Sequence, residues 1–386
     1  MIAHPEEAVK GGRSGAQQLT EGAGMWYNQK NAASQGDEAM DKSILFAPLS
    51  LKRITLPGRL IRSATELFGS TPDAHIRPVE VEIYRRLGEE PLGMILTSHT
   101  CVSPEGRSNP YQNAVWDDGY LPDAEAIAQA GGKRGVPVVM QIGHGGMKAE
   151  GNNGGLPVLT PDNMTHEQIR SLVRAFGEAA LRARKAGMAG IMLHGAHLYL
   201  LSQFFYPKFN HRTDAYGGCA LNRFRVLREI MEEVLTVCGE SCPLFLKING
   251  DDEGNTEEYH RDLVEALRSA EGLLDAVEIS GWHSAPLGVA EKPYFLDNVR
   301  RLSREIGTPV IEVGGFRSAP AMLEAIEAGA CAVSVCRPLL CEPDFPTKIR
   351  DRDGVVSRCV GCGFCFGPYD PASGIRCPRA GRILPE

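Results

Sequence analysis

The stretch THEQIRSLVRAFGEAALRARKAGMAGIMLH, residues 165–194, contains the two periodicities that decide the fold. Apolar residues recur three to four positions apart over its first two thirds, which predicts an amphipathic helix. Gln168 follows Thr165 by three residues, as in a capping box, and Gly187 is a typical helix stop. The short apolar run GIMLH (190–194) predicts a buried strand. A helix followed at once by a buried strand is the repeating unit of parallel α/β folds.

The same alternation of short β-branched runs and helical stretches extends along the chain from residue 59. The other strand candidates are residues 59–64, 93–98, 137–142, 243–248, 275–280, 309–314 and 331–335. Eight strands, each followed by helical sequence, predict an α/β protein with a closed (β/α)8 TIM barrel. A doubly wound open sheet is the competing fold, but no Gly-x-Gly-x-x-Gly follows an early strand.

Composition divides the chain into three parts. Residues 1–42 are rich in Gly, Ser, Gln, Ala and Glu without an apolar period, which predicts a disordered extension, and Met40 is an alternative start. Residues 43–356 form the predicted barrel, and residues 357–386 form a short Cys-rich C-terminal tail.

Bulk composition excludes several classes of partner. Apolar residues make up 43% and charged residues 23%, as in ordinary globular proteins. The net charge of −7 argues against binding to nucleic acid or to an anionic membrane. No apolar run reaches the roughly 20 residues that span a bilayer. The N-terminus lacks an apolar signal core, so we expect a cytoplasmic protein.

Polar residues gather where the predicted strands end. A TIM barrel places its active site at these C-terminal strand ends and in the loops that follow. The residues there are Thr65 and Glu66, Ser98 and His99, Gln141 and His144, His194, His197 and Tyr199, Lys247, Trp282 and His283, Gly314 and Gly315, and Arg337. Each alone could be a structural residue, but their regular placement predicts one shared site.

The segment HGAHLYLLSQFFYPKFNHRTDAYGG, residues 194–218, resembles the old yellow enzyme family, specifically its NADH:flavin oxidoreductase and 2,4-dienoyl-CoA reductase branch. His194, His197 and Tyr199 match the family's His-x-x-His/Asn-x-Tyr motif. Further matching pieces are RSAT (62–65), VSPEGR (102–107), QIGHGG (141–146), VGGF (313–316) and CRPLL (336–340). The resemblance covers about residues 44–378. It implies an oxidoreductase that takes hydride from NAD(P)H through FMN and reduces the activated C=C of an unsaturated carbonyl substrate.

Three residues fit the chemistry of that reduction. The imidazoles of His194 and His197 can donate hydrogen bonds to a carbonyl oxygen as negative charge develops on it. The phenol of Tyr199, with an ordinary pKa near ~10, can supply the proton for the second carbon. Leu198 departs from the family, which usually has glycine there. A bulky side chain at that position predicts a displaced Tyr199 or a narrower pocket.

The resemblance also implies an FMN site. Its residues would be Ala64, Thr65, Ser98, Gln141, Lys247, Gly314, Gly315, Cys336 and Arg337. Lys247 would offset the negative charge of a reduced flavin, and Gln141 would meet the pyrimidine edge. Gly314, Gly315, Cys336 and Arg337 would bind the phosphate through backbone N–H groups and a guanidinium. His283 is either a further polar group of the site or a surface-loop histidine.

Four cysteines close the chain in a tight pattern. Cys359, Cys362, Cys365 and Cys377 have the spacing Cys-x2-Cys-x2-Cys-x11-Cys. This spacing favours a [4Fe–4S] cluster over zinc, with free thiols as the remaining alternative. The dienoyl-CoA reductase branch has a similar cluster, but with three residues between the second and third cysteines. There the cluster receives electrons from a later FAD and NAD(P)H domain, so a cluster here would need a separate electron-donor protein, or would be structural.

The sequence therefore predicts an FMN-dependent ene-reductase. An electron-transfer flavin/iron–sulfur subunit fed by a partner protein is the alternative, motivated by the cysteine tail. A flavin-free phosphate-binding barrel such as an aldolase is a third reading, weakened by the lack of a Schiff-base lysine at strand six. The choice between NADH and NADPH stays open, and the chain is compatible with a homo-oligomer.

Overall fold

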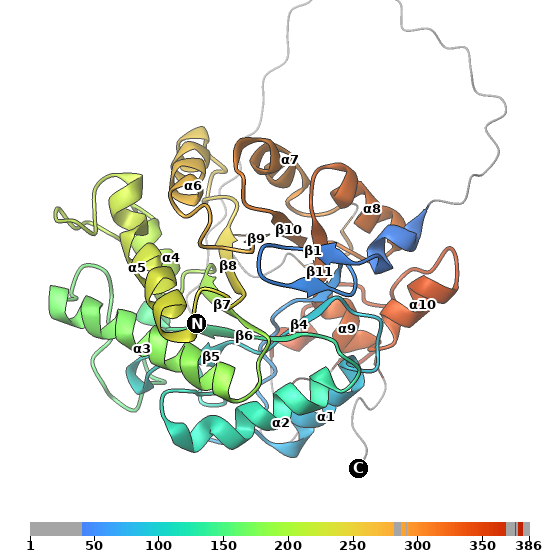
Figure 1. Cartoon of the computed structure of the whole chain (residues 1–386), viewed down its shortest axis with the longest axis horizontal. Coiled ribbons are helices and arrows are strands. Elements are labelled where there is room, and N and C mark those ends of the chain that lie inside the picture. The colour runs from blue at the N-terminus through green and yellow to red at the C-terminus, as the bar shows by residue number, and fades with distance from the viewer. Residues whose placement is uncertain (1–40, 282–286, 291, 368–374, 376, 381–386) are drawn as a thin grey trace, which may run out of the picture. The chain divides into compact units, whose positions relative to one another are not determined.

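The computed structural model describes residues 41–281, 287–290, 292–367, 375 and 377–380, and its main element is a closed parallel barrel (Figure 1). The barrel strands are β3 (Leu60–Arg62), β4 (Met94–Leu96), β6 (Val138–Gly143), β7 (Gly190–Gly195), β8 (Leu244–Asn249), β9 (Ala276–Ser280), β10 (Val310–Val313) and β11 (Ala332–Val335). Each pairs in parallel with its neighbours, and the β4–β6 and β11–β3 pairings close the ring. The predicted TIM barrel and its eight strands are confirmed. The predicted extension (apart from its last two residues), Trp282 and His283 lie outside the described residues.

Helices surround the strands in Figure 1. They are α1 (Pro78–Leu87), α2 (Leu121–Gly132), α3 (His166–Lys185), α4 (Leu200–Phe205), α5 (Ala220–Cys238), α6 (Glu257–Ser269), α7 (Leu296–Glu305), α8 (Ala319–Glu327), α9 (Arg337–Cys341) and α10 (Phe345–Asp351). Helix α3 begins at the predicted capping box, in which the Gln168 backbone N–H donates to Thr165 Oγ1 at 3.2 Å. It ends just before Gly187, whose φ of +86° suits glycine alone among common residues. Because a helix with one apolar face must bury that face, α3 packs against strands β6 and β7 and against helix α5.

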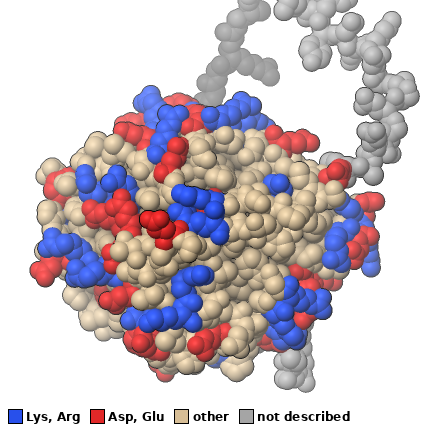
Figure 2. Space-filling view, in the orientation of Figure 1, with Lys and Arg blue, Asp and Glu red and all other residues tan. Residues whose placement is uncertain are grey.

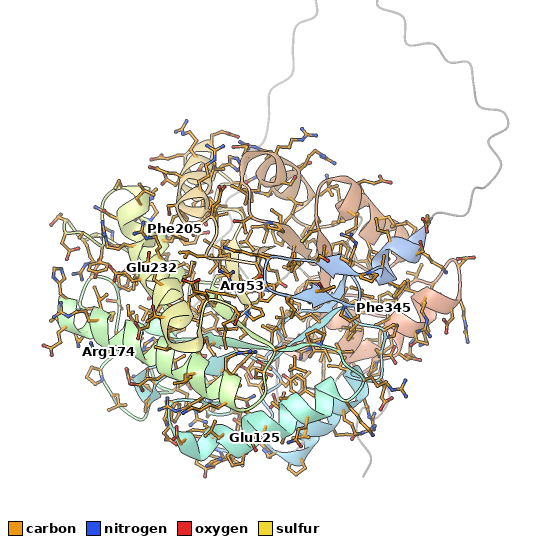
Figure 3. All side chains as sticks on the ribbon, viewed as in Figure 1. Arg53, Glu125, Arg174, Phe205, Glu232 and Phe345 are labelled. Carbon is orange, nitrogen blue, oxygen red and sulfur yellow. The ribbon has the colours of Figure 1, made fainter. Side chains whose placement is uncertain are left out.

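The inside of the barrel is an apolar layer closed by a hairpin that the sequence did not predict. The layer contains Ile61, Leu96, Val139, Met192, Phe245, Ala276, Ile311 and Ala332. Strands β1 (Leu49–Ser50) and β2 (Thr55–Leu56) form an antiparallel hairpin whose leucines join this layer. Between the two strands, Arg53 pairs with Asp275 at 3.0 Å, just before β9 (Figure 3). The hairpin therefore covers the N-terminal end of the barrel.

The apolar layer explains which polar side chains reach the opposite end. Side chains of a strand alternate between its two faces, so a residue two positions after an inward residue also points inward. Two positions after the layer come six polar residues that reach the far end, Ser63, Gln141, His194, Lys247, Glu278 and Ser334, together with the apolar Val313 and with Ser98, which does not line the cavity described below. The same period that fills the barrel with apolar atoms thus delivers these polar groups to its C-terminal end.

The described surface has a mixed electrostatic character. Lys and Arg side chains are interspersed with Asp and Glu on the face drawn in Figure 2. A nucleic-acid-binding surface would instead gather positive charge on one patch or stripe. Within the described part of the chain, no helix combines the length and the apolarity needed to cross a bilayer.

Candidate active site

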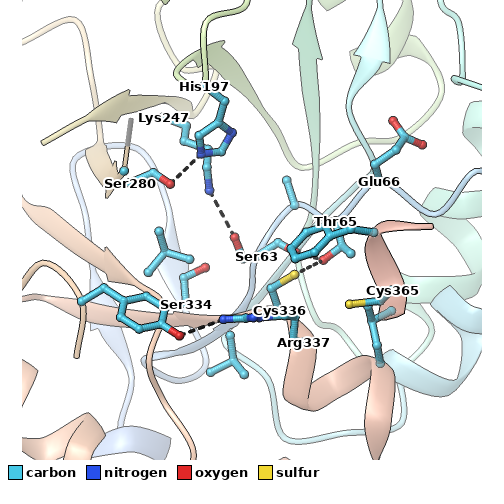
Figure 4. Close-up of a pocket in the computed structure, with 18 of the residues that line it drawn as sticks. Ser63, Thr65, Glu66, His197, Lys247, Ser280, Ser334, Cys336, Arg337 and Cys365 are labelled. Carbon is cyan, nitrogen blue, oxygen red and sulfur yellow. Dashed lines mark hydrogen bonds between the residues drawn. The ribbon is translucent and has the colours of Figure 1, made fainter. Parts of the chain in front are cut away.

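A cavity of about 500 Å³ lies at the C-terminal end of the barrel (Figure 4). Its volume falls within the ~300–1,000 Å³ typical of cofactor and ligand sites. The predicted site residues that line it are Ala64, Thr65, Gln141, His194, His197, Tyr199, Lys247, Gly314, Gly315, Cys336, Arg337, Cys359 and Cys365. The structure therefore brings together almost all of the side chains that the sequence placed at separate strand ends.

Ser98 is the predicted flavin residue that does not line this cavity. It is fully buried behind Thr65, and its hydroxyl contacts the Thr65 carbonyl oxygen at 3.0 Å and Glu80 Oε1 at 3.0 Å. Thr65 in turn places its own hydroxyl 3.0 Å from the Cys336 sulfur. Ser98 thus supports the backbone that holds Thr65 at the cavity wall, instead of facing the cavity itself.

Four aromatic rings form the polar wall of the cavity. The ring centroid of His194 lies 4.7 Å from that of Tyr199 and 5.1 Å from that of His197. His99, from the loop after β4, completes the group at 4.5 Å from Tyr199 and 4.7 Å from His194. His197 also shares a hydrogen bond of 2.8 Å between its Nε2 and Ser280 Oγ. The sequence had placed His99 at a strand end but had given it no role.

The histidines of this wall are neutral at physiological pH. Burial lowers the pKa of His194 and of His197 well below the ordinary value, and neighbouring positive groups lower it further. Burial likewise lowers the pKa of His99 to about 3. In the described part of the chain, His194 Nδ1 has no hydrogen-bond partner although it is buried. A buried, unpartnered ring nitrogen at a cavity wall is poised for a ligand.

The turn that carries these residues is strained at His197 and Leu198. Both have left-handed backbone angles, with φ of +60° and +59°, which cost roughly 1–2 kcal/mol each in residues other than glycine. The Asn249 side chain accepts a hydrogen bond from the His197 N–H at 2.9 Å, and Gln203 donates to the Leu198 carbonyl at 2.7 Å. The Leu198 side chain packs on the core and does not line the cavity, whereas Tyr199 does. Leu198 therefore does not narrow the pocket as expected. The effect of replacing glycine at this position is backbone strain.

At the wall that follows β10 and β11, glycines allow a ligand to approach the backbone closely. Gly314 and Gly315 have φ of +103° and +84°, and a Cβ on Gly315 would lie 2.8 Å from the Lys292 carbonyl oxygen. Arg337 follows β11, and its guanidinium donates to the Tyr294 hydroxyl at 2.8 Å (Figure 4). Exposed backbone N–H groups beside a guanidinium are a suitable site for a phosphate.

We expect Gly315→Ala to destabilise the protein and to abolish ligand binding at this wall. The new methyl group would collide with backbone atoms, which cannot move aside as a flexible side chain could. The matched control is Gly135→Ala, since Gly135 has a φ of +81° but nothing within 4 Å of an added Cβ. Both variants lose about 1 kcal/mol to backbone strain, and only Gly315→Ala adds the steric cost. Equal melting temperatures for the two variants would contradict this assignment.

Lys247 lies at the bottom of the cavity in a buried ion pair that the sequence did not reveal. Its ammonium group contacts the carboxylate of Glu278 on the neighbouring strand β9, and the two side chains are 4% and 0% exposed. The Ser63 hydroxyl lies 3.4 Å from Lys247 Nζ and 3.2 Å from Glu278 Oε1. The sequence feature that could have identified Glu278 as a site residue is its charge within an otherwise apolar strand.

Two further ionisable groups line the cavity near its opening. Burial, helped by repulsion from Glu80, raises the pKa of Glu66 to about 8. Lys148 lies 5.1 Å from the centre of the Tyr199 ring, and burial lowers its pKa from the ordinary value. The sequence places Glu66 among the polar strand-end residues without a role, and it gives no signal for Lys148, which lies outside the motif and the strands.

We expect Glu66→Gln to be more stable than the wild type at about pH 8 but not at about pH 5. The folded protein keeps the Glu66 proton up to a pKa of about 8, whereas the unfolded chain loses it near 4.5. The unfolded wild type therefore binds fewer protons than the native state between these values, so its stability falls as pH rises, by at most ~1.4 kcal/mol per pH unit. Glutamine has no proton to lose. Thermal unfolding across this range tests the point, and a difference in Tm that does not widen with pH would refute it.

The four cysteines of the tail lie in different surroundings. Cys359 and Cys365 line the cavity, Cys362 is exposed, and Cys377 lies beside Cys341 of α9. Burial raises the pKa of the Cys365 thiol to about 12. Among the residues that the structure describes, no group of three His, Cys, Asp or Glu side chains could hold a metal ion. The described thiols therefore do not fit the predicted [4Fe–4S] cluster or a zinc site.

The tail instead forms part of the cavity wall. Arg317 donates to the carbonyl oxygens of Cys359, at 2.7 Å, and Ser357, at 2.5 Å. Further along, the backbone of Ile375 bonds to Leu67 at 3.1 Å, and its side chain is buried. These contacts fasten the residues after the barrel to the loops that follow β10 and β3.

A flavin mononucleotide has a polar ring edge at one end and a phosphate at the other, and the cavity offers partners for both. Gln141 and Lys247 offer an amide and a cation at the barrel centre, and the glycines and Arg337 offer the phosphate wall. Ser334 Oγ is a buried hydroxyl without a partner in the described part of the chain, and it also faces the cavity. The residues present thus fit this cofactor.

Comparison with known proteins agrees with the fold and identifies a family. A model of the NADH:flavin oxidoreductase / NADH oxidase family matches residues 44–353. The NADPH dehydrogenase of Halalkalibacterium halodurans is 32% identical over 320 residues, which are 79% of this chain and 93% of that protein. The old yellow enzyme homologue of Zymomonas mobilis has a TM-score of 0.74 at 21% identity and covers 89% of this chain and 99% of its own. A 2-naphthoyl-CoA reductase has a TM-score of 0.76 at 22% identity, and the alignment covers 88% of this chain but 58% of the reductase.

The fold and the cavity define a TIM-barrel oxidoreductase. The chain belongs to the NADH:flavin oxidoreductase / NADH oxidase family, the old yellow enzyme family, because the family model matches most of its length. Membership implies FMN as cofactor and NAD(P)H as reductant.

Proposed function

We propose that this protein is an FMN-dependent reductase that uses NAD(P)H to reduce the activated C=C of an α,β-unsaturated carbonyl compound. The observation that carries the proposal is the wall formed by His194, His197 and Tyr199, where two neutral imidazoles and a phenol face one cavity. FMN, when bound, supplies the hydride chemistry that no side chain can provide. Gln141, Lys247, the two glycines and Arg337 would hold it.

The side chains of the wall have separate tasks in this proposal. His194 and His197 bind the substrate's carbonyl oxygen as neutral donors, and their hydrogen bonds strengthen as negative charge develops there. Neutral imidazoles suit this task because they donate a hydrogen bond without giving up a proton to the oxygen. Tyr199 holds the proton destined for the α-carbon at its phenolic oxygen. Burial of the histidines keeps water from competing for the carbonyl oxygen.

The relatives and the tail bear on two further choices, which are the nicotinamide cofactor and the route by which electrons reach the flavin. Relatives that cover most of the chain are named NADPH dehydrogenases, which favours NADPH as the reductant. The electron-transfer alternative and the 2,4-dienoyl-CoA reductase branch both use a cysteine-bound cluster. Since the described thiols do not fit one, we favour direct reduction by NADPH.

Purified protein tests the proposal directly. We expect flavin absorbance near about 450 nm, bleaching of this band by NADPH without oxygen, and its return when 2-cyclohexen-1-one is added. An iron and sulfide assay of the same anaerobic sample tests the cluster alternative. Protein that binds no flavin even after incubation with FMN would exclude the proposed function.

A further inference from the structure

The buried pair of Lys247 and Glu278 points to control of the cofactor's reduction potential. We propose that Glu278 neutralises Lys247, so that the wall beside the flavin carries no net positive charge. The inference rests on the proposed function, because it concerns FMN in this cavity. Glu278 itself does not line the cavity, so it acts through Lys247 and is a positioning residue.

The pairing is enforced by the strands. Lys247 and Glu278 are direct neighbours in the parallel register of β8 and β9, and both side chains point inward by the alternation described above. Ser63, which follows β3, contacts both side chains through its hydroxyl, and Figure 4 shows its bond to Lys247. At 4% and 0% exposure, water does not screen the two charges, so the ammonium and the carboxylate remain in contact.

The electrostatic consequence has a definite sign. Reduction adds negative charge to a flavin, and a nearby lone cation would stabilise the reduced form. A carboxylate in contact with that cation opposes its field, so the pair presents a small dipole instead of a full charge. The potential of the bound flavin should therefore be more negative than Lys247 alone would give. A more negative potential makes the reduced cofactor a stronger hydride donor towards the unsaturated substrate.

The detailed contacts of Glu278 agree with this role. Its Oε1 atom contacts both Lys247 and Ser63, while Oε2 has no hydrogen-bond partner in the described part of the chain. An unpartnered buried acceptor costs free energy, so the contacts of Glu278 do not maximise stability. Buried ion pairs are also often no more stabilising than apolar residues of similar size. Its charge beside Lys247 is therefore the property that the site uses.

Potentiometric titration of the flavin-bound protein tests the inference in two variants. Glu278→Gln leaves Lys247 unopposed, and we expect the equilibrium to shift at least tenfold towards reduced flavin, which is about +30 mV for a two-electron couple. The double variant Lys247→Met/Glu278→Gln removes both buried charges and avoids the cost of an unpaired one. We expect it to shift the equilibrium less than tenfold in either direction.

The control and the contrary outcomes are distinct. Glu312→Gln removes another fully buried carboxyl group, on the adjacent strand β10, and should leave the potential unchanged at a pH above about 7, the value to which burial raises the pKa of Glu312. An unchanged or lower potential in Glu278→Gln would overturn the inference. A shift of tenfold or more towards oxidised flavin in the double variant would also overturn it. The double variant gives this answer even if Glu278→Gln does not fold. Protein without any flavin would instead refute the proposed function, so the two failures can be told apart.

Discussion

Tyr199→Phe is expected to slow the oxidative half-reaction by about 10²–10⁴-fold and to leave reduction of the flavin by NADPH unchanged. The substitution removes only the phenolic oxygen, which we assign as the holder of the proton for the α-carbon. The ring would keep its contacts with His194 and His99, so the aromatic wall should persist. Stopped-flow measurements of the two half-reactions, each followed at the flavin band, give the two rates separately.

The matched control for this variant is Tyr216→Phe. Tyr216 belongs to the same sequence motif, but its hydroxyl donates to Glu229 at 3.0 Å and it does not line the cavity. Loss of this hydroxyl should leave both half-reactions near their wild-type rates. Equal slowing of both halves in Tyr199→Phe would point to structural damage and would remove Tyr199 from the proton-transfer step.

Arg337→Met is expected to weaken FMN binding by about 10²-fold, the second large effect. A guanidinium that binds a phosphate through charged hydrogen bonds contributes roughly 1.5–3 kcal/mol for each bond, and methionine keeps the length of the side chain without the charge. Fluorescence titration of the flavin-free protein measures the change in Kd. Because riboflavin lacks the phosphate, its affinity should stay the same in the variant.

A graded second variant sharpens this test. The Tyr294 hydroxyl accepts a hydrogen bond from Arg337 at 2.8 Å and so helps to orient its guanidinium. Tyr294→Phe should therefore weaken FMN binding less than Arg337→Met does. If riboflavin and FMN lose affinity equally in Arg337→Met, the phosphate is bound elsewhere.

Much of the fold could be predicted because each strand and helix of the barrel has a characteristic pattern of apolar residues. Strands covered on both faces appear as short continuous apolar runs, and the helices between them show one apolar stripe. On most strands the first inward position after the apolar layer is polar, as at Gln141, His194 and Lys247. These residues could be assigned to one site from the sequence because parallel strands bring their C-terminal ends to one rim.

The remainder depended on contacts between residues distant in the chain. Nothing near Glu278 in the sequence indicates that it faces Lys247, since the contact follows from register between two strands. The spacing of the tail cysteines resembles that of metal ligands, yet Cys359 and Cys365 line the cavity while Cys362 faces solvent. Spacing constrains which thiols can meet, and the path of the backbone decides which do.

The hairpin of β1 and β2 has a consequence for the order of events during turnover. By covering the N-terminal end of the barrel, it leaves the opposite rim as the side from which the cavity is reached. The nicotinamide and the unsaturated substrate would then enter from the same rim and bind at the same place beside the cofactor. Each must dissociate before the other can bind. We therefore expect a high concentration of the unsaturated substrate to inhibit the enzyme competitively with respect to NADPH. Steady-state kinetics at varied concentrations of both reactants would measure this inhibition.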